Sequence, residues 1–80
     1  MVREVWTFNE GDKPLVFFSI KDDKCMSSWF VDDFPFERVL IYHLCVGLQE
    51  DLCGRDASFS KLKKYYINDF HFEKREVWEQ

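Results

Sequence analysis

The chain has 80 residues and a formal net charge of −4 at pH 7, and it carries nine Phe, three Trp and three Tyr. This length allows one hydrophobic core, so we expect a single domain over residues 1–80. A hydrophobic content of 46% excludes a disordered chain, and no apolar run approaches the ~18 residues of a membrane span.

The N-terminal third of the chain predicts three strands. Residues 2–8 alternate between two faces, as a half-buried strand does, and residues 15–20 form an apolar and aromatic run, interrupted only by Ser19, that is typical of a strand inside a sheet. The polar residues 9–14 contain Gly and Pro, so we expect a hairpin with a longer loop there. Residues 21–24 predict a second polar turn, and residues 25–31 predict the third strand.

The longer of two predicted helices covers residues 34–53, where apolar side chains recur at helical spacing. Asp32 or Asp33 is expected to cap its N-terminus, Pro35 is tolerated in the first turn, and Gly54 suits the C-terminal cap. The apolar positions occupy more than one stripe, so this helix is expected to pack across the sheet.

Gly47 lies inside that helix and is expected to allow a strand or a second helix to approach closely. A shorter helix is predicted over residues 57–66, with Asp56 or Ser58 as its cap. Residues 69–78 alternate again and predict a final strand, with a helical tail as the alternative. The order β-β-β-α-α-β predicts an α+β fold, a mostly antiparallel sheet with both helices on one face.

Residues 29–38 resemble residues 65–74, with four of ten positions identical. A stacked repeat protein needs about three units, which this chain cannot supply at that period. We interpret this similarity between the two segments as coincidence in an aromatic, acidic sequence, with reuse of one local turn as the alternative.

The cysteines favour a reducing compartment. Cys25, Cys45 and Cys53 are an odd number, which does not make a disulfide framework, and the last two lie in an apolar stretch. We therefore expect three reduced, structural thiols. Because the N-terminal residues also lack a signal pattern, we expect the protein in the cytoplasm, or in the host cytoplasm if it is viral.

No motif points to catalysis. The sequence has no Gly-rich phosphate loop, no nucleophile elbow and no closely spaced pair of metal ligands. His43 and Cys45 are two residues apart on the predicted helix, about 200° around its axis, so they cannot hold one ion together. We expect no enzyme activity, no metal and no cofactor, and we interpret His43 as a hydrogen-bonded or half-exposed histidine without a catalytic role.

One group of residues is typical of nucleic-acid binding: Lys61, Lys63, Lys64, Tyr65 and Tyr66. Cations beside stacking rings hold single strands. A chain of net charge −4, however, lacks the broad basic face of most such proteins, so we expect nucleic acid to be bound weakly, if directly at all.

The composition favours a small acidic protein-binding module. Acidic residues around exposed rings are typical of an interface that docks on a basic partner, such as a nucleic-acid-processing enzyme. Inhibitors, immunity proteins, antitoxins and accessory proteins of phages or other viruses have this composition. The predicted contact residues are acidic pairs at turns and two nearby rings: Asp22, Asp23, Trp29, Asp32, Asp33 and Phe34.

Two alternatives remain open. Trp29 and Phe34 would fill the core if they follow the habit of most large aromatic residues. The protein would be a self-associating, homodimeric accessory protein if strands at the two termini form open sheet edges.

Overall fold

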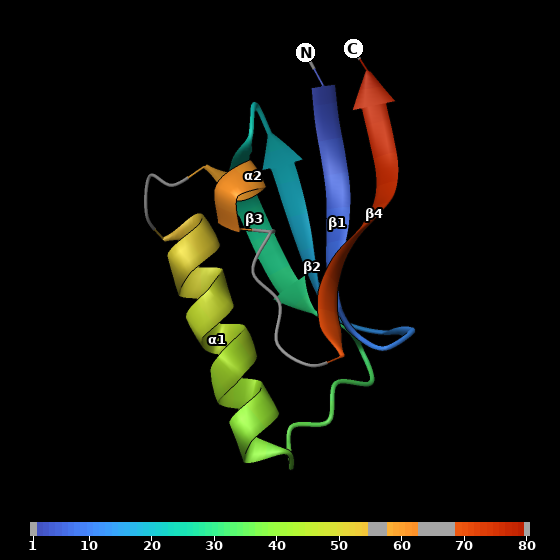
Figure 1. Cartoon of the computed structure of the whole chain (residues 1–80), viewed down its shortest axis with the longest axis vertical. Coiled ribbons are helices and arrows are strands. Elements are labelled where there is room, and N and C mark those ends of the chain that lie inside the picture. The colour runs from blue at the N-terminus through green and yellow to red at the C-terminus, as the bar shows by residue number, and fades with distance from the viewer. Residues whose placement is uncertain (1, 55–57, 63–68, 80) are drawn as a thin grey trace.

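A computed structural model describes residues 2–54, 58–62 and 69–79. Its elements, in chain order, are β1 (Val2–Glu10), β2 (Lys13–Lys21), β3 (Lys24–Phe30), α1 (Val39–Cys53), α2 (Phe59–Leu62) and β4 (Phe70–Glu79) (Figure 1). This order confirms the predicted α+β fold. The final strand is confirmed as well, and the alternative of a helical tail is wrong.

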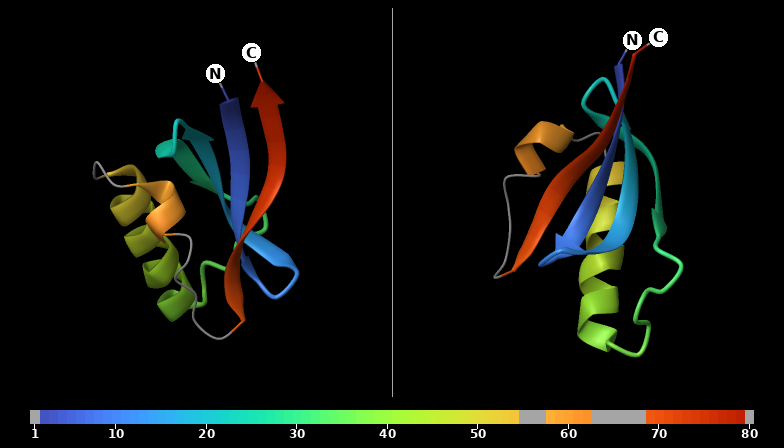
Figure 2. Two further views of the ribbon diagram at one scale, coloured as in Figure 1. Left: turned by 45° about the horizontal axis from the view of Figure 1, so that its top comes forward. Right: turned by 90° about the vertical axis from the view of Figure 1, so that its right-hand side faces the viewer.

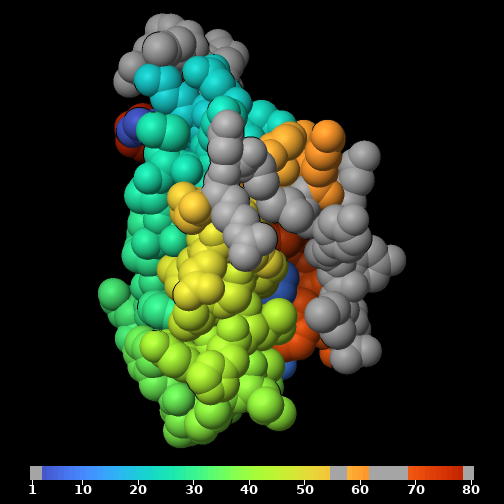
Figure 3. Space-filling view, turned by 90° about the vertical axis from the view of Figure 1, so that its left-hand side faces the viewer, coloured from blue at the N-terminus to red at the C-terminus, as the bar shows by residue number. Residues whose placement is uncertain are grey.

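The four strands form one antiparallel sheet in the order β3-β2-β1-β4. Both helices lie on the same side of it, as the left view of Figure 2 and the space-filling view of the helical side in Figure 3 show. The N-terminal strand β1 is internal, because β4 returns after the helices and pairs along its free side. The prediction that both terminal strands are edges is therefore wrong for β1, and the edges are β3 and β4.

The two hairpins are tight. Glu10 pairs with Lys13, so only Gly11 and Asp12 form the first turn, and the predicted longer loop is wrong. Gly11 has a φ of 62°, a conformation that other residues rarely adopt. The second turn places two non-glycine residues at positive φ, Asp22 at 53° and Asp23 at 64°. Positive φ at both central residues is the type I′ pattern, which matches the twist of the flanking strands.

The face of the sheet toward the helices carries the aromatic core. Phe59 of α2 lies at its centre, with its ring centroid 5.3 Å from Trp6, 6.2 Å from Phe18 and 5.6 Å from Phe72. Trp6 and Phe18 are directly opposite each other on β1 and β2, so the register delivers both rings to one helix residue. This packing explains why even a four-residue helix is held on the sheet.

α1 begins at Val39, later than the predicted residue 34, and its N-cap position holds Arg38, which makes no side-chain cap. Asp32 and Asp33 are exposed in a turn before it, so the prediction that either caps the helix is wrong. Arg38 instead binds Glu10 through two hydrogen bonds of 2.6 and 2.9 Å. The guanidinium holds the pKa of the Glu10 carboxyl below its ordinary value. This exposed ion pair joins the start of α1 to the end of β1.

An aromatic cluster explains the late start of the helix. Phe34 is only 5% exposed, and its ring centroid lies 4.6 Å from that of Phe30 and 4.9 Å from that of Phe36. Tyr42 of α1 stacks on Phe30 at 5.7 Å. Because these rings meet only if the chain turns between β3 and α1, their packing outweighs the helix signal over residues 34–38. The interpretation that Phe34 fills the core is confirmed.

The two predictions made for glycines of α1 have different outcomes. Gly54 occupies the C-cap as predicted, where its N–H donates to the Glu50 carbonyl at 2.9 Å. A Cβ at Gly54 would lie 2.6 Å from that oxygen, so the cap excludes larger residues. Gly47 meets no described atom within 4 Å of such a Cβ, so the predicted close approach of another element is wrong.

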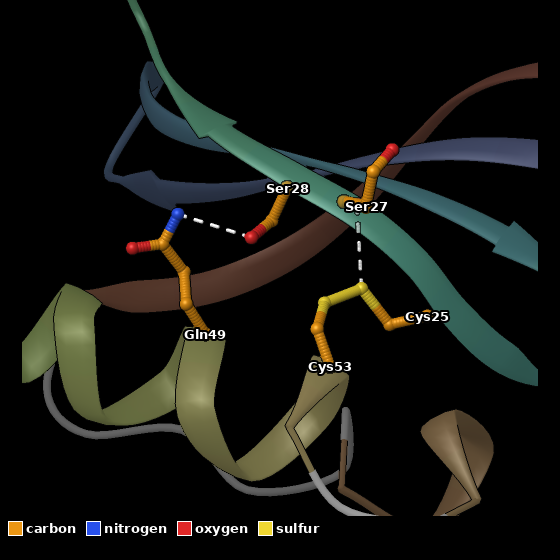
Figure 4. The surroundings of a disulfide bond; sticks show 5 residues. All are labelled: Cys25, Ser27, Ser28, Gln49 and Cys53. Carbon is orange, nitrogen blue, oxygen red and sulfur yellow. Dashed lines mark hydrogen bonds between the residues drawn. A yellow bond between two sulfur atoms is a disulfide. The ribbon is translucent and has the colours of Figure 1, made fainter.

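A disulfide joins Cys25 at the start of β3 to Cys53 at the end of α1 (Figure 4). The prediction of three reduced thiols is therefore wrong for these two residues. The topology explains the pairing: α1 runs back along β3, and Gln49 one turn earlier also reaches β3, donating to Ser28 Oγ at 3.0 Å. Cys45 is the free cysteine; it is buried, as predicted, and burial raises the pKa of its thiol to about 11.

The predicted helix at 57–66 is seen only as α2, because residues 55–57 and 63–68, including the candidate cap Asp56, lie outside the described residues. The start of α2 is held by Asp23 of the β2–β3 turn. Its carboxylate accepts the Ser60 N–H and the Ser60 hydroxyl, both at 2.8 Å, and also the Ser58 hydroxyl. A residue far away in sequence thus does the capping that we expected from Ser58.

The two aspartates of that turn make a matched pair for a stability test. Replacing Asp22 by Gly is expected to raise the free energy of unfolding by up to about 1 kcal/mol, because glycine relieves the left-handed strain. Replacing Asp23 by Gly relieves the same strain but removes the acceptor at α2, so we expect a net loss of about 1 kcal/mol. Urea unfolding measures both. Equal stabilisation by the two changes would show that the Asp23 carboxylate does not hold α2.

Candidate binding surface on the open face of the sheet

The face of the sheet opposite the helices carries a row of paired side chains across all four strands. The register places Trp29 of β3 opposite Phe17 of β2, Phe17 opposite Thr7 of β1, and Thr7 opposite Glu73 of β4. Because side chains alternate along a strand, all four point away from the aromatic core. We call this side of the sheet the open face.

Trp29 and Phe17 form an aromatic wall on the open face. Their rings are nearly parallel, at 15°, with centroids 5.6 Å apart. Trp29 is 47% exposed, although it is one of the largest apolar side chains in the protein. A partly stacked, partly exposed tryptophan presents a rigid apolar surface that loses little conformational entropy on binding.

Beside this wall the open face is hollowed into a depression of about 590 Å³. Residues from the β1–β2 hairpin and from every strand line it: Val5, Asp12, Pro14, Phe17, Trp29, Arg75 and Glu76. Its lining is therefore apolar and aromatic on one side and charged on the other. This volume falls within the range of small-ligand and side-chain pockets, roughly 300–1,000 Å³.

A β-bulge sets the position of Arg75. Trp6 pairs with Lys74 and Val5 with Glu76, so Arg75 is the extra residue on β4. Such a bulge redirects a side chain, and here Arg75 Nε donates to Thr7 Oγ1 at 3.0 Å. Its guanidinium also lies 3.7 Å from Glu73 Oε1, which offsets its charge.

The carboxylate of Glu76 is oriented by a neighbouring ring. Trp78 Nε1 donates to Glu76 Oε2 at 2.7 Å, and Trp78 is itself an exposed aromatic residue at the end of β4. Asp12 faces the depression from the tip of the β1–β2 hairpin. With Arg75 paired to Glu73, Asp12 and Glu76 leave the depression negative.

The predicted contact residues do not come together. Asp22 and Asp23 precede β3, whereas Asp32 and Asp33 follow it, and a strand of seven residues separates the two pairs by about 20 Å. Asp23 is engaged with α2.

The two predicted aromatic residues also lie on opposite sides of the sheet. Phe34 is buried on the helical side and cannot contact a partner at the surface. Trp29 alone of the six predicted residues belongs to the depression on the open face.

Sequence reasoning missed Asp12, Phe17, Arg75 and Glu76. Phe17 lies in the apolar run of β2, and only the strand register shows that it lies opposite Trp29. Arg75 was read as one position in an alternating strand, and nothing in the sequence marks it as a bulge. Asp12 lies in a turn, as predicted, but the sequence does not show that this turn borders the same depression as Glu76.

Other candidate chemistry finds little support in the described part of the chain. Among residues 2–54, 58–62 and 69–79, no three metal-ligating side chains come together. His43 is exposed on α1, and Cys45 is too deeply buried and too weakly acidic to serve as a nucleophile. Of the predicted nucleic-acid group, Lys61 is exposed, whereas Lys63, Lys64, Tyr65 and Tyr66 lie outside the described residues.

Neither of the described helices is long and apolar enough to cross a bilayer. Comparisons of the chain with protein-family models, with curated proteins and with solved structures found no match.

Proposed function

We propose that the protein is a small binding module that docks its open face on a protein partner with a basic surface. The observation that carries this proposal is the half-exposed Trp29, stacked on Phe17 beside a depression that also holds Asp12 and Glu76. A buried anchor surrounded by polar groups is the usual energetic centre of a protein interface.

The charge of the chain supports the same type of partner. A net charge of −4 and a sequence pI of about 5.0 attract basic surfaces and repel nucleic acid. A nucleic-acid-processing enzyme is one such partner, and the role of an inhibitor or of a phage or viral accessory protein stays a prediction. The cytoplasm also stays a prediction, and the Cys25–Cys53 bridge removes the cysteine argument that favoured it.

Self-association is the alternative function. The exposed edge of β4 carries Glu73, Lys74, Arg75 and Glu76 in succession, with a bulge at Arg75. Charges and bulges on an edge strand oppose pairing with another edge, so this strand favours a monomer. Sedimentation equilibrium of the free protein distinguishes the two functions, and a stable dimer would favour self-association.

Truncation of Trp29 tests the proposed function. We expect Trp29→Ala to weaken binding of a captured partner by roughly 30-fold or more, the effect of losing an anchor worth about 2 kcal/mol. Leu40→Ala is the matched control, because Leu40 is 83% exposed on α1, away from the open face. Calorimetry with the purified partner measures both. Equal affinities for wild type and Trp29→Ala would contradict the proposal.

A further inference from the structure

The geometry points to an arginine side chain of the partner as the occupant of the depression. We propose that its guanidinium lies against the aromatic wall of Phe17 and Trp29, in a depression that Asp12 and Glu76 also line. This inference rests on the proposed function, because it names the group through which a basic partner would be recognised.

The charges of the depression select a cation. Its lining holds two carboxylates, Asp12 and Glu76, and one cation, Arg75. Glu73 lies 3.7 Å from the Arg75 guanidinium and offsets its charge. Arg75 Nε donates to Thr7 Oγ1, which turns this side chain toward β1. An acidic ligand would therefore meet two carboxylates and one cation whose charge Glu73 already offsets.

The aromatic wall selects a planar cation over a compact one. A guanidinium stacks on aromatic rings, is more weakly hydrated than an ammonium, and can donate two parallel hydrogen bonds to one carboxylate. Glu76 is suited to such a bond because Trp78 holds one of its oxygens at 2.7 Å and fixes the carboxylate. A lysine ammonium would complement the negative charge of the carboxylates, but it would gain less stabilisation from contact with the aromatic rings.

The depression has room for more than one arginine side chain. A volume of about 590 Å³ exceeds what one side chain fills, so residues flanking the arginine would also be accommodated. Apolar surface from Val5 and Pro14 is available for them.

The experiment titrates the ¹⁵N-labelled protein with a blocked nonapeptide that contains arginine at its centre and two further arginines. Matched peptides carry lysine or citrulline at the same three places, since citrulline keeps the shape of arginine without its charge. The indole N–H signals of Trp29 and Trp78 are followed, with Trp29→Phe used to assign the first. We expect the arginine peptide to shift both signals and to bind at least tenfold more tightly than the citrulline peptide and several-fold more tightly than the lysine peptide.

Paired variants localise the effect. Asp12→Asn and Glu76→Gln are each expected to weaken binding of the arginine peptide by threefold or more. Glu50→Gln changes an exposed acid on α1 and is expected to leave the affinity for this peptide unchanged. Equal binding of arginine and citrulline peptides would overturn the arginine site, as would shifts confined to Asp22, Asp23, Asp32 and Asp33. Tighter binding of a single-stranded oligonucleotide than of the arginine peptide to the same indoles would overturn it as well.

The two proposals fail in different ways. If Trp29→Ala weakens binding of the partner but the citrulline peptide binds as tightly as the arginine peptide, the open face is the interface and the arginine site is wrong. If the arginine peptide binds as expected but Trp29→Ala leaves partner affinity unchanged, the proposed function is wrong.

Discussion

Replacing Phe18 by Ala is expected to lower the free energy of unfolding by about 3–5 kcal/mol. A chain of 80 residues has a total stability of roughly 4–12 kcal/mol, so this one change removes a large share of it. Phe18 is fully buried on β2 and packs against Phe59 of α2 and Phe72 of β4. The truncated side chain would leave a cavity at the point where α2 meets two strands.

Phe36→Ala is the matched control for this prediction. Phe36 has the same side chain and belongs to a ring cluster, but it is 54% exposed beside the start of α1. Less surface is returned to water there, so we expect a loss below about 1.5 kcal/mol. Urea unfolding followed by circular dichroism measures both variants. Similar losses for the two would mean that the core does not centre on the contact between β2 and α2.

The strands could be predicted because their signals are local. Residues 2–8 and 69–78 place aromatic side chains at every second position in part of their length, and residues 15–20 are apolar except for Ser19, which identified β1, β4 and the internal strand β2. Polar turn residues also marked both hairpins. In these segments the local preference and the final packing agree, which is the condition under which a sequence pattern is sufficient.

The start of α1 could not be predicted because packing decides it. The sequence Phe-x-Phe-Glu occurs at residues 34–37 and again at residues 70–73. In the first copy it forms turns around a buried Phe34, and in the second it forms the first half of β4. The two copies differ in their neighbours: one faces Phe30 and Tyr42, and the other pairs with β1.

The candidate site could be predicted only in part, for a similar reason. Trp29 was identified from its size and its acidic surroundings. Its partner Phe17 depends on the β2–β3 register, and the place of Arg75 depends on a bulge in the β1–β4 pairing. The acidic pairs were expected to act together because they are close in sequence, yet β3 separates them. Alternation gives the face of each residue, whereas register and bulges decide which residues share a site.

The disulfide shows the same dependence on topology. Counting cysteines argued for free thiols, because an odd number cannot all be paired. Only the antiparallel course of α1 along β3 brings Cys25 and Cys53 together. Cys25 Sγ lies 3.3 Å from the Ser27 carbonyl oxygen. In the disulfide this sulfur carries no hydrogen, so it can donate a hydrogen bond to that oxygen only after reduction.

Reducing this bridge is expected to lower the free energy of unfolding by about 2–4 kcal/mol. The bridge closes a loop with a sequence separation of 28 residues, so it restricts the unfolded chain more than the folded one. For a domain of this size each kcal/mol corresponds to about 4–8 °C in Tm. Thermal unfolding with and without reductant measures the loss, and the Cys25→Ser, Cys53→Ser double variant is the control, since reductant should leave its Tm unchanged.

Thiol titration decides whether that bridge forms in the protein as isolated. In denaturant without reductant we expect one reactive thiol, that of Cys45, and after reduction all three. Three thiols before reduction, together with a Tm that does not respond to reductant, would contradict the pairing. The result also bears on where the protein works: a bridge that persists requires an oxidising compartment, whereas in a reducing cytoplasm the fold would depend on its aromatic core alone. The loss of unfolding free energy caused by Phe18→Ala should therefore have its largest consequence in the reduced protein. Adding reductant to the Phe18→Ala variant measures whether it still folds without the bridge.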